Sequence, residues 1–435
     1  MLKTFQYATL FVLFLLINFI SCTTSNALVQ TSTNTETEQI KPEQEIIDIA
    51  KKIHSQAIIL DAHADIATPT TSANFLSSDG LSKVAISKLK KGGLSAVVMS
   101  IAVPPGPRTM KGDIQARIEA NRQLTIISNR IDSMETSFLL INSVSDISRA
   151  KEIGKVAIIL GFQNARSLQK DVTVIDSFYN EGVRLFGLNH LGHNEFSDSS
   201  RPFFDSKTGT YEPDAEHGGL SPLGIEAIKR INLLGGIIDV SQMSKAATLQ
   251  ALQLSTAPII ASHSNVRSIS NVSRNLSDEE IDLFGKKGGV IHVSPFRAYL
   301  LDYSNPSLIE EIKTARRAAG LSEIYSYPFE LYWEIKDPTK QYAFLKSISD
   351  IIGPADVDHL IDHIDYIVNR IGIDHVGIGT DFNHGSGIDG FMDAADALNV
   401  TIGLVRRGYS EKDIKKIWGG NFIRVFQEAE RQAKK

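Results

Sequence analysis

The chain has almost no cysteine: Cys22 is the only one among its 435 residues. A single thiol excludes an internal disulfide. The formal net charge is only −5, and no stretch combines clustered basic residues with interleaved aromatic ones, so we expect no nucleic-acid partner. The sequence also lacks a phosphate-cradling glycine motif and internal repeats, which excludes a P-loop nucleotide site and a repeat architecture.

Long apolar runs are scarce as well, and the longest is the segment from Tyr7 to Ile20. Lys3 precedes this run, which is short for a membrane-spanning helix but typical of a signal-peptide core. It ends in Ser21 and Cys22, which resembles the cleavage box of bacterial lipoproteins. We therefore predict a lipoprotein signal peptide over 1–22 with lipidation of Cys22. The protein would then be anchored to a membrane of the bacterial cell envelope, on its periplasmic or surface side.

The next segment, 23–40, consists mainly of Thr, Ser, Asn, Gln and Glu. It contains too few apolar residues to offset the entropy lost on ordering, so we predict a disordered polar tether. With 42% hydrophobic and 22% charged residues, the chain has the composition of an ordinary soluble globular protein, and we assign 41–435 to one folded domain.

Eight short apolar runs alternate with helical patterns in this domain. They lie at 57–60, 94–103, 156–160, 183–188, 235–240, 257–261, 288–293 and 375–379. This alternation predicts an α/β fold with a parallel sheet, and eight units predict a (β/α)₈ or TIM barrel, preceded by an N-terminal extension. Between the seventh and eighth strands, 296–350 forms a helical insertion rich in aromatic residues, which either roofs a pocket or packs on the barrel.

Polar residues follow the predicted strands, and barrel enzymes carry their chemistry at the carboxyl ends of strands. The first strand runs into Asp61, His63 and Asp65, which strict alternation would place on one face, where imidazole and carboxylate can bind one cation. A histidine at a strand end is also commonly structural, so this motif alone leaves both interpretations open. The polar segment 192–219 is long for a connection and is a candidate functional loop.

Taken in order, the motifs of residues 50–430 resemble those of the membrane (renal-type) dipeptidases, which are metallopeptidases of the amidohydrolase barrel superfamily. The motifs are Asp61-Ala-His63-Ala-Asp65, Gly182-Val-Arg184 through Asn189-His190, Gly219-Leu-Ser-Pro-Leu-Gly224, Ser262-His263-Ser264 with Arg274-Asn275, Asp374 to Phe382, Arg407 to Ser410 and Gly419 to Phe422. The resemblance implies a barrel enzyme that hydrolyses dipeptides with two zinc ions at its mouth.

The resemblance assigns His63 and Asp65 to the first zinc and His263 to the second. The chain departs from the family at two further ligand positions, where Gln163 replaces a bridging glutamate and Gln242 replaces a histidine. A bridging carboxylate offers two anionic oxygens to two dications, whereas glutamine offers one neutral oxygen. We therefore expect one Zn²⁺, with two as the alternative, held by His63 and Asp65 with Asp381 or His263.

The resemblance also implies roles for three other residues once a metal-bound hydroxide attacks the peptide carbonyl. Asp381 would orient the water and carry its proton to the leaving amine, and His190 would contact the substrate carbonyl. Arg274 would bind the substrate's free carboxylate. From the residues alone, a capping role for Asp381, a structural role for His190 and a surface position for Arg274 remain open.

Three functions are therefore compatible with the sequence. The first is a lipid-anchored metallo-dipeptidase with a dipeptide or dipeptide-like substrate. The second keeps the barrel but performs other chemistry, such as isomerisation or cyclic-amide hydrolysis. The third is a binding lipoprotein without catalysis. The sequence leaves both monomer and homodimer open.

Overall fold

The computed structural model describes residues 42–205 and 207–433. The predicted signal peptide, Cys22 and the whole of the predicted tether lie outside the described residues and stay predictions. Within the described part, none of the helices has both the length and the apolarity needed to cross a membrane.

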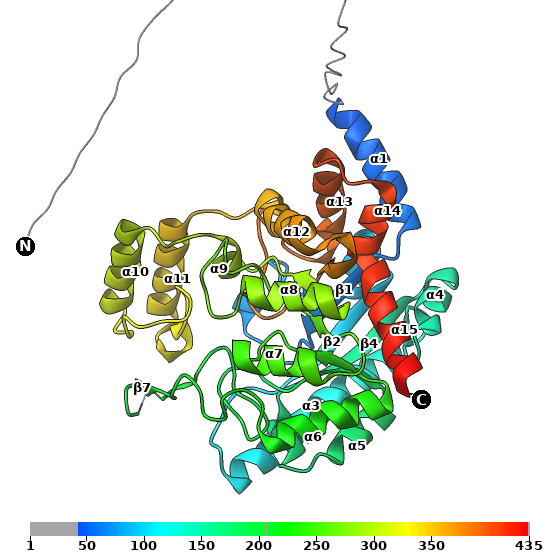
Figure 1. Ribbon diagram of the computed structural model, residues 1–435. Helices are drawn as coiled ribbons and strands as arrows, with labels where there is room; N and C mark the ends of the chain where they lie inside the picture. Colours follow the sequence, from blue (N-terminus) through cyan, green and yellow to red (C-terminus); the bar gives the residue numbers. More distant parts are fainter. Residues whose placement is uncertain (1–41, 206, 434–435) are drawn as a thin grey trace, which may run out of the picture. The chain divides into compact units, whose positions relative to one another are not determined.

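Eight parallel strands form the wall of a barrel (Figure 1). Each of the eight predicted apolar runs contributes one strand. In spatial order they are β1 (Leu60–Asp65), β2 (Ala96–Ala102), β4 (Val156–Gln163), β5 (Val183–Gly187), β8 (Ile237–Asp239), β9 (Ile260–Ala261), β10 (Val290–Val293) and β11 (Val376–Ile378). The predicted TIM-barrel fold is confirmed.

The barrel is nearly closed where β11 meets β1. A parallel bridge pairs Ala64 with Phe382 just beyond the end of β11. The backbone N–H of Asp65 donates to Phe382 O over 2.9 Å, and that of Asp381 donates to His63 O over 2.8 Å. These bonds place the ends of the first and last strands side by side.

Helices surround the wall, and local sequence explains several of their ends. In α6 (Pro222–Leu234) the Ser221 side chain accepts from Gly224 N, and Gly235 ends the helix in the left-handed conformation. A capping box of Ser277 and Glu280 begins α8 (Asp278–Lys287). The other main helices are α1 (Glu43–Gln56), α2 (Ile86–Lys91), α3 (Met110–Ser133), α4 (Ser145–Glu152), α5 (Val174–Asn180), α7 (Lys245–Leu254), α12 (Val357–Ile371), α13 (Ala397–Arg406), α14 (Glu411–Lys415) and α15 (Asn421–Ala433).

Alternating strand residues build two hydrophobic cores. One set, including Val97, Ile158 and Ile238, packs against the surrounding helices. The other set, including Val98 and Ile159, fills the barrel together with α15. Two side chains of α15 bond to backbone near the amino ends of strands: Asn421 Nδ2 donates to Val376 O at the start of β11, and Arg424 donates to Gly288 O just before β10. This helix therefore lies at the amino ends of β10 and β11, opposite the carboxyl ends that carry the candidate site.

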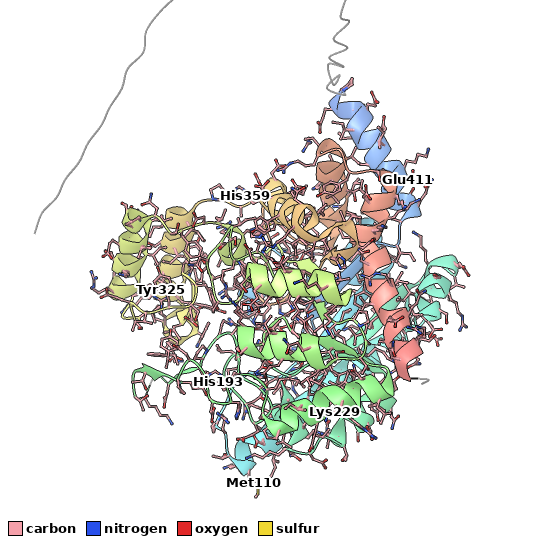
Figure 2. All side chains as sticks on the ribbon, viewed as in Figure 1. Met110, His193, Lys229, Tyr325, His359 and Glu411 are labelled. Carbon is pink, nitrogen blue, oxygen red and sulfur yellow. The ribbon has the colours of Figure 1, made fainter. Side chains whose placement is uncertain are left out.

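The predicted insertion is present between β10 and β11. It contains α9 (Arg297–Leu300), α10 (Pro306–Ala318) and α11 (Pro338–Ile352), which lie beside the barrel at the left of Figure 1. Tyr325, labelled in Figure 2, is one of its aromatic residues. Sequence reasoning missed the short strand β3 (Phe138–Leu140) and a hairpin of β6 (Phe204–Asp205) and β7 (Thr210–Tyr211) in the long polar loop.

One buried histidine outside the barrel makes stability depend on pH. His363 in α12 accepts from Val266 N through Nδ1 and donates to Leu300 O from Nε2, at 3.0 and 3.1 Å. Burial lowers its pKa to about 4, opposed by the bond to Leu300. Because the unfolded state then binds one more proton between pH 6.5 and 4, stability falls as pH falls through this window, by about 3 kcal/mol at pH 4.

We test this with His363→Gln, because a glutamine amide can keep both hydrogen bonds but does not titrate. Denaturant unfolding gives the free energy of unfolding at a series of pH values. Between pH 6.5 and 4 this free energy should depend on pH less steeply in the variant than in wild type, by the amount expected for one proton fewer taken up on unfolding. An unchanged slope would show that His363 does not carry the effect.

Candidate active site

The side chains predicted from the strand ends all lie on the carboxyl side of the barrel. Ordered along the wall, they are His63 and Asp65 in β1, Gln163 at the end of β4, His190 after β5, Gln242 after β8, His263 after β9 and Asp381 after β11. Six of these seven are buried, and the Asp65 side chain is 14% exposed.

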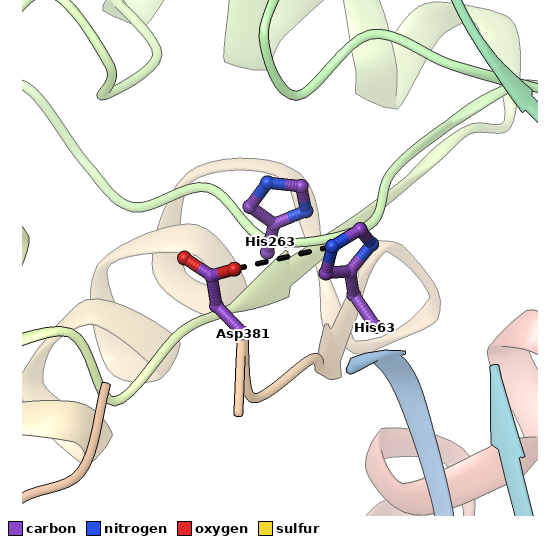
Figure 3. Close-up of side chains that lie close together, drawn as sticks. All are labelled: His63, His263 and Asp381. Carbon is purple, nitrogen blue, oxygen red and sulfur yellow. Dashed lines mark ion pairs between the residues drawn. The ribbon is translucent and has the colours of Figure 1, made fainter. Parts of the chain in front are cut away.

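Three of these side chains form a cluster with metal-ligating atoms. One atom each of His63, His263 and Asp381 lies within 4.8 Å of the others. In Figure 3 the Asp381 carboxylate faces the His63 ring, and the His263 ring lies next to that of His63. His63 Nε2 is 3.9 Å from Asp381 Oδ1 and 3.3 Å from Asp65 Oδ1. His63 and Asp65 thus face the same space, as the sequence predicted.

Asp61 does not join them, so that part of the alternation argument is wrong. Along β1, Asp61 pairs with Val97 but Asp65 pairs with Ser100, because an irregularity between Asp61 and Ala64 adds one residue to this strand. Asp61 instead accepts hydrogen bonds from the Thr380 hydroxyl and backbone N–H, at 2.6 and 2.8 Å. It fixes the turn that presents Asp381.

Asp381 stands in a conformation that few residues adopt. Its φ is +56°, in the left-handed region, which costs free energy for a residue with a Cβ. Burial raises the pKa of its carboxyl, while His384 and His63 act to lower it. Asp65 is different: burial acts to raise its pKa, but His384 and His63 outweigh burial and hold the pKa below its ordinary value.

The local field at His63 favours a cation. Burial acts to lower the pKa of His63, yet Asp65, Asp381 and Asp239 together raise it. His63 Nε2 and Asp65 Oδ1 are buried and lie 3.3 Å apart as an ion pair, and neither atom has a further partner within the described residues. A cation bound between them would give each atom a second interaction.

A buried serine and aspartate fix the orientation of both imidazoles. Ser262 donates its hydroxyl hydrogen to Asp239 Oδ2 over 2.6 Å. Its oxygen lies 2.8 Å from His263 Nδ1 and 3.4 Å from His63 Nδ1. Because the hydroxyl has only one hydrogen, both rings donate from Nδ1, which leaves Nε2 of each ring for its contacts within the site.

The Nε2 atoms of the two histidines have different neighbours. His63 Nε2 faces Asp65 Oδ1, whereas His263 Nε2 lies 3.2 Å from the Gln242 side-chain nitrogen. Burial, followed by the nearby charges of His63 and Arg274, lowers the pKa of His263 well below its ordinary value. The neutral ring therefore accepts from the Gln242 amide. The Gln242 oxygen in turn accepts from Arg201 over 3.3 Å.

The side chains around His63 are suited to bind a metal ion, and the second family position has weaker donors. Two zinc ligands at about 2.0–2.1 Å in tetrahedral geometry lie roughly 3.3 Å apart, as His63 Nε2 and Asp65 Oδ1 do. Asp381 is placed to be a third ligand. At the second position Gln163 brings no charge, and the amide of Gln242 already uses the lone pair of His263 Nε2. The donors that remain there suit zinc poorly.

The predicted substrate residues are buried around this cluster. Burial and the cations His384 and Arg201 lower the pKa of His190 well below its ordinary value, and its Nδ1 has no hydrogen-bond partner among the described residues. Arg274 is 2% exposed, so it is not a surface residue. It donates to the backbone oxygens of Ser241 and His263, and its Nε makes no hydrogen bond in the described part.

Sequence reasoning missed two residues of the site. His384 Nδ1 lies 2.8 Å from Asp65 Oδ2, on the side away from His63, and it follows Asp381 by three residues. Arg201 lies in the long polar loop, whose length was the only signal. Asp198 holds this loop in place by accepting from three backbone N–H groups, those of Glu216, His217 and Gly219.

Comparison with known proteins gives one consistent result. Residues 47–435 match the family model of membrane dipeptidases, peptidase family M19. The chain is similar to the crystal structure of the probable dipeptidase PvdM from Pseudomonas aeruginosa, with 34% identity, a TM-score of 0.78, and coverage of 89% of this chain and 99% of the other.

Two further similarities are more distant. Dipeptidase tcpJ from Claviceps purpurea is 27% identical over 80% of this chain and 69% of its own length. A metallopeptidase from Rhodobacter sphaeroides, solved with a phosphinate mimic of the dipeptide L-Ala-D-Ala, shares the fold with a TM-score of 0.66 and 18% identity, covering 86% of this chain and 99% of its own. The family match spans nearly all of the folded domain. The chain belongs to the membrane dipeptidase family and has the predicted class, a hydrolase of the metallo-dipeptidase type.

Proposed function

We propose that this protein hydrolyses dipeptides with a single zinc ion held by His63, Asp65 and Asp381. The observation that carries the proposal is the buried pair His63 Nε2 and Asp65 Oδ1, 3.3 Å apart with no further partner among the described residues, in a field that favours a cation. A bound zinc would supply Lewis acidity and an activated water at neutral pH. The Rhodobacter sphaeroides structure with its dipeptide mimic supports the substrate class.

The protein's own residues supply the proton transfers. Asp381, at the end of the last strand and 3.9 Å from His63 Nε2, takes the proton of the attacking water and passes it to the leaving amine. The neutral His190 ring donates one N–H to the substrate carbonyl oxygen, where negative charge develops. Arg274 binds the terminal carboxylate through its remaining N–H groups.

The site also favours a second candidate function. The bond from Gln242 to His263 occupies an atom that a second metal would need, and this arrangement suits a binding lipoprotein that holds a peptide without cleaving it. For either function we propose that lipidated Cys22 anchors the domain to the bacterial envelope through the 23–40 tether.

A dipeptide assay separates the two. Purified protein should hydrolyse dipeptides with a free C-terminus, lose the activity in a chelator, and regain it when zinc is returned. The same dipeptides with an amidated C-terminus should react far more slowly. Protein that retains zinc but cleaves no dipeptide in a broad panel would favour the binding function.

A further inference from the structure

A cavity of about 550 Å³ opens beside the candidate site and reaches it through His190, Arg201 and His384. This volume lies in the range of small-molecule sites, about 300–1,000 Å³. Much of its wall is aromatic, and the insertion between β10 and β11 contributes most of these side chains. The aromatic residues of the wall are Phe75, Phe296, Tyr299, Tyr327, Phe329, Tyr332 and Trp333.

The charge of this wall has one sign. Among the described residues, those that line the cavity include Lys83, Arg201 and Arg297 but neither aspartate nor glutamate. Lys83 is 4% exposed, and its ammonium donates to the backbone oxygen of Ser386 rather than to a carboxylate. An aromatic cavity with only positive charges fits an anionic ligand that has a large apolar part.

Arg201 is the cavity cation in contact with the candidate site, through its bond to Gln242. It is 4% exposed, and its two terminal nitrogens donate over 3.3 Å to neutral oxygens, those of Tyr327 and Gln242. Its Nε is buried without a hydrogen-bond partner, and no carboxylate in the described part lies within ion-pair distance. A buried guanidinium in this state gains strongly from an anionic ligand.

Arg274 is a second buried guanidinium, but its contacts differ. It donates to two backbone oxygens, and it is absent from the cavity wall. One carboxylate on the substrate can therefore pair directly with Arg201 or with Arg274. A ligand with two anionic groups can pair with both.

We propose that the cavity selects dipeptides with a second anionic group, bound by Arg201, and with an aromatic side chain held by the cavity wall. An aromatic residue followed by an acidic one, as in Phe-Glu, meets this description. The inference rests on the proposed dipeptidase function, in which Arg274 binds the terminal carboxylate.

Binding of uncleavable ligands tests the inference without relying on turnover. The probes are phosphinate analogues of Phe-Glu and Phe-Gln, titrated calorimetrically into the zinc-loaded protein. The acid should bind about 10- to 100-fold more tightly than the amide, because a charge-assisted bidentate pair replaces neutral contacts. Equal affinities in wild type would overturn the proposal, whether or not the protein hydrolyses dipeptides.

Three variants assign the effect to Arg201. Arg201→Met should remove the preference, so that the acid and the amide bind with equal affinity, and Arg201→Lys should restore part of it. Arg297→Met removes a positive charge from the same wall at a less buried residue, and this variant should keep most of the preference for the acid. If Arg297→Met abolishes the preference as fully as Arg201→Met does, the overall positive charge of the wall, and not Arg201 itself, selects the anionic ligand.

Discussion

Replacing Asp381 with asparagine should lower kcat for dipeptide hydrolysis by about 10²- to 10⁴-fold, the range for loss of a general acid–base group. The substitution keeps the size and shape of the side chain but removes its ability to take a proton. KM should change much less, because Arg274 and the cavity wall remain. Zinc content should fall only in part, since His63 and Asp65 are untouched.

Asp389→Asn is the matched control for this variant. Asp389 belongs to the same segment after β11 and undergoes the same chemical change, but it is exposed and lies away from the cluster. Its kcat should stay at the wild-type value. If Asp381→Asn also kept kcat within about threefold of wild type, Asp381 would be a structural residue of the turn and not the proton carrier.

The double substitution Gln163→Glu and Gln242→His should raise zinc content from about one ion to about two per chain. The first change adds a carboxylate at the end of β4. The second removes the amide that hydrogen-bonds to His263 Nε2 and adds an imidazole. Both changes favour zinc, because imidazole and carboxylate are far better zinc ligands than amide groups.

Thermal unfolding gives an independent readout of this double variant. Without metal, the new carboxylate is buried at a position where Gln163 is 3% exposed, so the variant should unfold at a lower temperature than wild type in a chelator. With zinc it should gain more stability than wild type, since a ligand that binds only the folded state stabilises it. If the zinc content of the double variant stays at one ion per chain, the two ligand replacements alone do not explain the missing second metal ion.

The barrel could be predicted from the sequence because each strand is a nearly uninterrupted apolar run. Both faces of such a strand are buried, so the strand appears as a continuous apolar run that can be recognised from local sequence alone. The strand ends were predicted for the same reason, since His63, His263 and Asp381 each follow an apolar run. The helix-free hairpin at 204–211 was missed because its strands are two residues long and lie in a polar loop.

Contacts between distant segments could not be predicted in the same way. The irregularity in β1 that moves Asp61 away from Asp65 depends on pairing with β2, and local sequence does not show it. Arg201 meets Gln242 across 41 residues, and His384 meets Asp65 across 319. The departures at Gln163 and Gln242 are visible in the sequence, but only the structure shows that the Gln242 amide hydrogen-bonds to His263 Nε2.

Metal analysis of the purified protein, with a His63→Ala variant beside it, tests the central claim most directly. The account predicts close to one zinc ion per wild-type chain and almost none in the variant. Two ions per wild-type chain, or one ion that persists without His63, would contradict it.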